Sequence, residues 1–141
     1  MTTALIDDFC RVYQGLDKNN LSQLGLVYSD NINFIDALHN LKGLDQLSDY
    51  FSHLYGHLLY CNFNIEEVIQ DEGKASIIWT MQYAHPKINK GKAIFVNGCS
   101  HLKFNEKIYY HRDFLDMGQM LYEHLPLLGG VIRIVKKRVA S

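Results

Sequence analysis

The spacing of the apolar residues changes once along this chain, and that change limits the folds that the chain can adopt. Up to about residue 58, apolar residues recur every three or four positions, as they do on one face of an α-helix. Between residues 62 and 113 they alternate with polar residues or run together between turn-forming clusters, as they do in β-strands. Helices that precede a block of strands predict an α+β fold, in which the helices pack on one face of a sheet.

The helix-like part contains three predicted helices. Asn20 suits the N-cap of the second helix, and the third helix begins at Leu44. A brief strand around Ile32 and Phe34, followed by a loop over residues 36–43, is predicted between them. The apolar faces of the three helices consist of Leu5, Phe9, Val12 and Leu16, then Leu21, Leu24 and Val27, then Leu47, Phe51, Leu54, Tyr55 and Leu58.

The strand-like part contains four predicted strands, over residues 62–69, 75–85, 92–104 and 107–113. Because short turns at residues 71–73, 86–91 and 105–106 connect them, we expect an antiparallel meander.

A helical extension is predicted after the strands. Pro126 and the pair Gly129 and Gly130 should break or kink it. Since residues 131, 132, 134 and 135 are β-branched, a final strand over residues 131–139 is the alternative. The helical pattern consists of Leu115, Gln119, Tyr122, Leu125, Leu128, Val131 or Ile132, Val135 and Val139.

Length and composition predict one globular domain that spans residues 1–141. The three cysteines, Cys10, Cys61 and Cys99, are too widely spaced for a metal site or an obvious disulfide, so we expect reduced thiols. The first residues contain no basic segment, and no apolar stretch is long enough to cross a membrane. We therefore expect a cytoplasmic protein without a membrane partner.

Charge is distributed unevenly along the chain. Residues 1–73 carry three basic and eleven acidic side chains, whereas residues 74–141 carry eleven basic and four acidic ones. Such asymmetry can indicate a nucleic-acid surface, but we favour halves that pack against each other or against a second subunit. The cations near the end of the chain suit the C-terminus of a helix, and we predict no nucleic-acid partner.

Strand alternation selects the candidate site residues. One face of the second predicted strand carries Ile77, Trp79, Met81 and Tyr83. This face forms either ordinary core or the wall of an apolar cavity. From the pattern alone we favour ordinary core.

In the last predicted strand, Tyr109, His111 and Asp113 share a face. A histidine beside a carboxylate can form an acid/base pair. The alternatives are a surface contact, or a role for Asp113 as the cap of a helix that starts near Phe114. Asp36 follows a short strand, where it is either an acid/base group or the cap of the following loop.

Other chemical motifs are weak. His53 and His57 lie one helical turn apart, but no third ligand accompanies them, and the chain has no phosphate-binding or dinucleotide-binding fingerprint. We therefore predict no metal and no cofactor.

Four short stretches in the first half resemble the ketosteroid isomerases: Arg11 to Tyr13, Leu21 to Leu24, Tyr28 to Asp30 and Phe34 to Asp36. The stretch His111-Arg-Asp-Phe-Leu-Asp116 resembles the W-R-D-Y-F-D stretch of the limonene epoxide hydrolases. In order and spacing, the whole chain resembles the SnoaL-like branch of the nuclear transport factor 2-like (NTF2-like) superfamily. That resemblance implies a cone, in which helices close a strongly curved, mainly antiparallel sheet around a deep pocket.

The resemblance also implies roles for single residues. Tyr13 matches the isomerase tyrosine that donates to the oxyanion, Asp36 matches the isomerase base, and Asp113 matches an aspartate of the epoxide hydrolases. Ser100 stands where the isomerases place a protonated acid, and residues 79–83 lack the arginine and aspartate that the hydrolases use. We therefore expect neither ketosteroid isomerisation nor epoxide hydrolysis.

Two functions stay open. One is a cofactor-independent isomerase, cyclase or lyase that moves a proton on a small hydrophobic carbonyl compound. Asp113 or Asp36 would be its base, His111 the partner of that base, and Tyr13 with Ser100 the donors to the enolate. The ligand-binding wall would consist of Phe34, Trp79, Met81, Tyr83 and Ser100. The alternative is a non-catalytic ligand-binding or protein-interaction domain. We expect a homodimer in both cases, because the helices can cover only one face of the sheet.

Overall fold

A six-stranded mixed sheet organises the computed structural model of the chain, which describes residues 3–124 and 128–141. The strands, in the order β2-β1-β6-β5-β4-β3, are β1 (Tyr28–Ile35), β2 (Asn40–Lys42), β3 (Tyr60–Asp71), β4 (Lys74–Ala84), β5 (Ile94–Phe104) and β6 (Ile108–Leu115). The α-helices are α1 (Ala4–Gly15), α2 (Leu24–Val27), α3 (Leu44–His57), α4 (Met117–Met120) and α5 (Leu128–Ala140), and short 3-10 turns are η1 (Leu21–Gln23), η2 (Asn89–Gly91) and η3 (Tyr122–His124). The prediction of an α+β fold is confirmed.

The meander from β3 to β6 is antiparallel, as the sequence predicts. The first half of the chain adds more sheet than expected. The brief strand around Ile32 becomes β1, eight residues long, which pairs with β6 in parallel. Residues 40–42, predicted as loop, form the edge strand β2 on the other side of β1. The loop prediction is therefore wrong at these residues.

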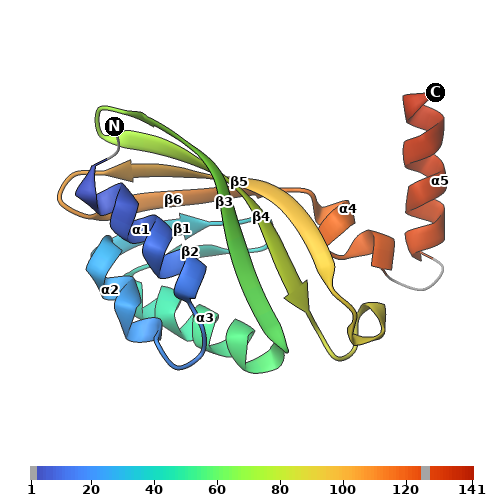
Figure 1. Cartoon of the computed structure of the whole chain (residues 1–141), viewed down its shortest axis with the longest axis horizontal. Helices are drawn as coiled ribbons and strands as arrows, with labels where there is room; N and C mark the ends of the chain where they lie inside the picture. Colours follow the sequence, from blue (N-terminus) through green and yellow to red (C-terminus); the bar gives the residue numbers. More distant parts are fainter. Residues whose placement is uncertain (1–2, 125–127) are drawn as a thin grey trace.

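The long strands bend over α1, α2 and α3, which lie together on the concave side of the sheet (Figure 1). Buried apolar side chains fill this space, among them Phe9 and Val12 of α1, Leu47 of α3, and Ile77 of β4. A strongly bent sheet with helices inside the bend has the cone shape that the resemblance implies.

A close approach between β4 and β5 requires a glycine. Trp79 pairs with Gly98 across the strands, and a Cβ atom at Gly98 would overlap the Trp79 ring. Because the glycine has no side chain, the indole packs directly onto the β5 backbone. This contact fixes the ring at the inner face of the sheet, where Trp79 is 3% exposed.

Two details of β6 correct the sequence analysis. The register shifts between Lys103 and Phe104, so Tyr109 becomes an extra residue in β6 and is exposed, away from His111. The prediction that Tyr109 shares the face of His111 is therefore wrong. The strand also continues past Asp113 to Leu115, and the side chain of Asp116 caps α4. Asp113 is thus no helix cap.

The C-terminal extension is a helix over residues 131–139 rather than a strand, since α5 spans Leu128–Ala140. In Figure 1, α5 stands away from the sheet. It approaches the domain through Gly129, which lies against the backbone of Glu123, and through Lys136, which lies 3.3 Å from Glu123 Oε1. Its apolar residues Val131, Val135 and Val139 are 53–82% exposed. The predictions for Leu125 and Pro126 concern residues outside the described part of the chain.

No helix within residues 3–124 and 128–141 is long and apolar enough to cross a bilayer.

Candidate small-molecule site

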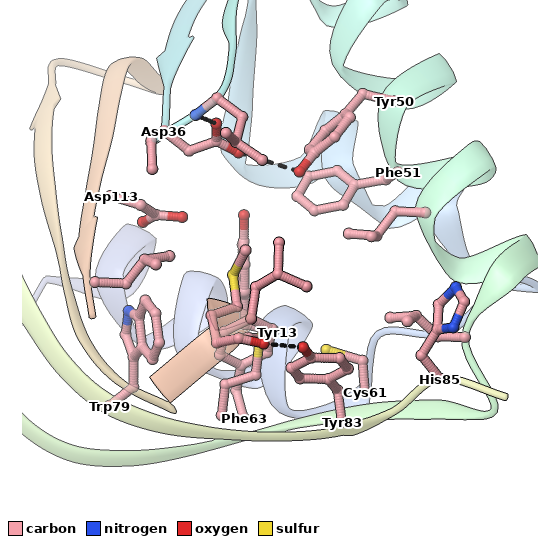
Figure 2. Close-up of a pocket in the computed structure, with 18 of the residues that line it drawn as sticks. Tyr13, Asp36, Tyr50, Phe51, Cys61, Phe63, Trp79, Tyr83, His85 and Asp113 are labelled. Carbon is pink, nitrogen blue, oxygen red and sulfur yellow. Dashed lines mark hydrogen bonds between the residues drawn. The ribbon is translucent and has the colours of Figure 1, made fainter. Parts of the chain in front are cut away.

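A cavity of about 220 Å³ lies between the concave face of the sheet and the helices (Figure 2). Its wall is mainly apolar and aromatic, with a few polar groups, which is the composition of a small-molecule pocket. The lining residues are Tyr13, Phe34, Asp36, Ala37, Leu38, Tyr50, Phe51, Leu54, Leu58, Cys61, Phe63, Trp79, Met81, Tyr83, His85, Ile88, Asp113, Leu115, Met120 and Leu121.

The cavity brings together residues that are far apart in the sequence. Of the nine site residues that the sequence analysis selected, seven line it: Tyr13, Phe34, Asp36, Trp79, Met81, Tyr83 and Asp113. The other two, Ser100 and His111, do not reach it. They are 2% and 0% exposed and lie behind Asp113, in hydrogen-bond contact with its carboxylate.

Asp36 is surrounded by donors. Its Oδ1 accepts hydrogen bonds from the backbone amides of Leu38 (2.8 Å) and His39 (2.7 Å), and His39 Nδ1 lies 3.1 Å away. Its Oδ2 accepts a hydrogen bond from the Tyr50 hydroxyl at 3.1 Å. These contacts are those of a carboxylate that holds the turn between β1 and β2. Because both of its oxygens already accept hydrogen bonds, Asp36 is a weaker candidate for a base than a carboxylate with an oxygen that accepts none.

Asp113 is held on one side only. Its Oδ1 accepts a hydrogen bond from Ser100 Oγ at 2.5 Å and lies 2.6 Å from His111 Nε2. Within the described part of the chain, no hydrogen bond reaches Oδ2. The carboxylate lines the cavity, and its side chain is 16% exposed (Figure 2). The second oxygen of Asp113 is therefore the carboxylate oxygen most open to a ligand.

The contacts of Asp113 continue into the core. Ser100 Oγ also accepts a hydrogen bond from Trp79 Nε1 at 2.9 Å. On the other side, His111 Nδ1 lies 2.7 Å from the Tyr28 hydroxyl, which lies 2.6 Å from the Tyr13 hydroxyl. We call Tyr13, Tyr28, His111 and Asp113 the buried chain. Both of its ends line the cavity, whereas Tyr28 and His111 are 0% exposed.

The phenols in and behind the cavity wall are neutral. Burial raises the pKa of Tyr13 and of Tyr28 well above the ordinary value, and the negative charge of Asp113 adds to the shift of each. Burial likewise raises the pKa of Tyr83 to about 12, and Tyr83 donates a hydrogen bond to the Met120 carbonyl. Burial and the nearby Asp36 raise the pKa of Tyr50 in the same way. Near neutral pH these hydroxyls therefore keep their hydrogen and carry no charge.

Sequence reasoning missed Tyr28 as a member of the site, although its segment is part of the resemblance. It also missed Tyr50, Phe63 and His85, which line the cavity. Alternation could have selected Phe63, because it lies two residues after Cys61 on the inner face of β3. Tyr50 is half-buried beside Phe51 on α3, and no period distinguishes it from an ordinary boundary residue.

The histidine pair of α3 was the one candidate for metal ligation in the sequence. His53 and His57 stack on the surface of α3 with their ring centres 4.4 Å apart. Among the described residues, no three histidine, cysteine, aspartate or glutamate side chains gather as a metal site would require.

Solved structures with this fold were found at low sequence identity. An NTF2-like protein of unknown function from Burkholderia pseudomallei superposes with a TM-score of 0.74 at 12% identity, over 84% of this chain and 95% of the other. A putative SnoaL-like polyketide cyclase from Shewanella putrefaciens gives a TM-score of 0.71 at 17% identity, over 85% and 95%. TerC, co-crystallised with polyporic acid, gives 0.70 at 11% identity, over 82% and 93%. At these identities the likeness establishes the fold alone.

Comparison with curated proteins by sequence gives no match. The family model of the SnoaL-like domain, by contrast, matches residues 9–111, well over half of the chain. The matched region contains the second part of α1, all of α2 and α3, and most of the sheet, which form the greater part of the cavity wall. The chain therefore belongs to the family of SnoaL-like domains.

Proposed function

We propose that this domain binds a small hydrophobic carbonyl or enol compound in the cavity and moves a proton on it without a cofactor, as an isomerase, cyclase or lyase. The observation that carries this proposal is the half-held carboxylate of Asp113, with Oδ1 bonded to Ser100 and His111 and Oδ2 facing an apolar cavity. A carboxylate in such surroundings is suited to take a proton from carbon, because few water molecules compete for it.

The rest of the wall supports the same class of ligand. The aromatic side chains of Phe51, Phe63 and Trp79 surround the space in Figure 2 and suit a flat conjugated compound. Tyr13 supplies a neutral hydroxyl for the oxygen on which negative charge develops. The relatives point in the same direction, since one is a putative SnoaL-like polyketide cyclase and another was crystallised with polyporic acid.

The hydrogen bonds favour roles within this proposal that differ from those expected from the sequence. Ser100 donates to Asp113 rather than into the cavity, so it positions the base and does not serve as a donor to the enolate. His111 is the second residue that positions Asp113. Asp36 already accepts several hydrogen bonds, so Asp113 is the better candidate for the base.

Hydrogen–deuterium exchange at carbon tests this role without knowledge of the natural substrate. A panel of small cyclic and aromatic ketones is incubated in D₂O with the protein, and loss of the proton next to the carbonyl is followed by NMR. We expect saturable binding and catalysed exchange by the wild type, and a loss of exchange of about a hundredfold or more in Asp113→Asn. Asp36→Asn is the matched control and should keep most of the exchange rate.

Equal exchange by the wild type and Asp113→Asn would show that Asp113 is not the base. Saturable binding without exchange by the wild type would instead favour the alternative function, a non-catalytic ligand-binding domain.

The outer face of the sheet supports a second proposal, that the domain is a homodimer. Phe95 and Phe114 lie on this face and are 59% and 52% exposed, while α1 to α3 lie on the opposite face (Figure 1). A second copy would cover these side chains, and the acidic and basic halves of the chain would complement each other across a two-fold axis. Light scattering should give twice the 16.3 kDa mass of the chain. A monomer at micromolar concentration would refute the dimer.

A further inference from the structure

The buried chain contains few hydrogens that can form the hydrogen bonds between its members. Its three contacts join the Tyr13 and Tyr28 hydroxyls (2.6 Å), the Tyr28 hydroxyl and His111 Nδ1 (2.7 Å), and His111 Nε2 and Asp113 Oδ1 (2.6 Å). At these distances each contact needs one hydrogen between its two heavy atoms. Each tyrosine supplies only one, and Tyr28 and His111 are too deeply buried to exchange their partners for solvent.

The number of protons on the His111–Asp113 pair therefore fixes the direction of every link. With one proton on the pair, His111 Nε2–H donates to the Asp113 carboxylate and Nδ1 is left with a lone pair. Nδ1 then accepts from Tyr28, and Tyr28 in turn accepts from Tyr13. In that state Tyr13 presents only a lone pair to the cavity.

A second proton on the pair reverses the links. Nδ1–H now donates to Tyr28, the Tyr28 hydroxyl donates to Tyr13, and the hydrogen of Tyr13 is released toward the cavity. Any mixed arrangement would set two lone pairs or two hydrogens against each other in a buried contact. Leaving a buried polar group unpaired costs about 1–3 kcal/mol, so the two uniform directions dominate.

The surroundings place the added proton on the pair rather than elsewhere. Two of the rings packed on the His111 imidazole carry no titratable group: Phe9 of α1 and Phe34 of β1, at 5.8 and 4.5 Å between ring centres. The other two are the phenols of Tyr13 and Tyr28, at 6.1 and 5.8 Å. The titratable groups that face the pair are Tyr13 of α1 and Tyr28 of β1, with Asp36 and Tyr50 farther along the cavity wall. Both phenols of the buried chain are held neutral by burial. β5 contributes the Ser100 hydroxyl, and the Cys99 thiol of the same strand is close enough to Asp113 for the carboxylate charge to help raise the pKa of that thiol after burial.

We propose that Tyr28 and His111 determine which ligand oxygen Tyr13 can bind. When the His111–Asp113 pair carries two protons, Tyr13 donates and selects an acceptor such as a carbonyl or enolate oxygen. When the pair carries one, Tyr13 accepts and selects a hydroxyl. Binding of a ketone at Tyr13 is thereby linked to the uptake of one proton by the His111–Asp113 pair. His111 itself does not touch the ligand. The choice of ligand rests on the proposed function, whereas the coupling itself is a property of the free protein.

NMR on the ligand-free protein tests the coupling. Protein labelled with ¹³C at the tyrosine Cζ atoms and ¹⁵N in the histidine rings is titrated from about pH 4 to about pH 9, the range in which histidine and its partners ordinarily change charge. We expect the Cζ signals of Tyr13 and Tyr28 to move with the same midpoint as the His111 nitrogens. In Tyr28→Phe, which keeps the ring, His111 should still titrate while Tyr13 no longer responds.

Three results would overturn the coupling: a His111 that keeps one protonation state throughout, a Tyr13 signal that does not move in the wild type, or a Tyr13 response that is unchanged in Tyr28→Phe. The wild-type titration alone can refute it, so the test does not depend on how well the variant folds.

A second measurement separates the coupling from the proposed function. The dissociation constant of cyclohexanone, an acceptor-only probe, should rise about tenfold per pH unit above the midpoint in the wild type, as linkage to one proton requires, and stay flat in Tyr28→Phe. If the wild type binds the ketone with no pH dependence, the buried chain does not select the ligand. If the NMR coupling is present and no ketone of the panel binds, the proposed function fails and the coupling stands.

Discussion

Replacing Ser100 by alanine should test whether the hydrogen bonds behind Asp113 contribute to stability. Ser100 Oγ accepts from Trp79 Nε1 at 2.9 Å and donates to Asp113 Oδ1 at 2.5 Å, in a side chain that is 2% exposed. Without it, the buried indole N–H has no partner, at a cost of about 1–3 kcal/mol. The carboxylate also loses one of its two donors, and a hydrogen bond to a charged group contributes about 1.5–3 kcal/mol.

The two losses should not add fully. Because 16% of the Asp113 side chain is exposed, solvent can replace part of the missing bond. We therefore expect Ser100→Ala to lower the free energy of unfolding by about 2–4 kcal/mol, which a domain of ordinary stability survives. With a urea m-value of about 2 kcal/mol per molar, the midpoint should fall by roughly 1–2 M.

Urea titration followed by fluorescence measures this change directly, because Trp79 is the single tryptophan of the chain and lies next to the mutated site. Ser76→Ala on the neighbouring strand is the control, since Ser76 faces the outer side of the sheet and should change stability by less than about 0.5 kcal/mol. A Ser100→Ala protein as stable as the control would refute the reasoning and show that the indole and the carboxylate find other partners.

Three further predictions concern stability. Gly98→Ala should destabilise the fold by about 1–3 kcal/mol, because the added Cβ atom would overlap the Trp79 ring. Gly15→Ala is the control and should not destabilise the fold, because no atom lies within 4 Å of its added Cβ. Urea titrations of both variants measure the difference. The raised pKa of Tyr83, about 12 in the folded chain against an ordinary value of about 10, means that the unfolded chain loses this proton first. Stability should therefore fall as the pH rises from about 10 to about 12. In an absorbance titration, the buried tyrosines should ionise only when the protein unfolds. Ionisation of all nine tyrosines before unfolding would contradict this prediction. Removal of residues 128–141 should change the free energy of unfolding by less than about 1 kcal/mol, because the exposed ion pairs of α5 contribute little. A large drop in melting temperature would instead show that α5 packs on the domain.

The sequence by itself determined the fold class and one wall of the cavity. The change from helical to alternating spacing separates α1 to α3 from the meander, because each period reflects a local backbone geometry that one stretch of sequence can specify. Alternation within β4 places Trp79, Met81 and Tyr83 on one face, and the resemblance selected Tyr13, Asp36 and Asp113, all of which line the cavity. These inferences depend on neighbours a few residues apart.

Tertiary structure alone decided how these residues act on one another. Tyr28 and His111 are 83 residues apart and meet because β1 lies beside β6 in parallel, a pairing that no alternation pattern specifies. Ser100 lies behind Asp113 because the register of β5 against β6 sets the two residues opposite each other. One extra residue at Tyr109 was enough to invalidate a face assignment. The spacing in the tail predicts a helix, but it did not specify that Val131, Val135 and Val139 of α5 would be exposed. Periodicity states which way a side chain points from its own strand or helix; which residues it then meets depends on pairing and register between segments far apart in the chain.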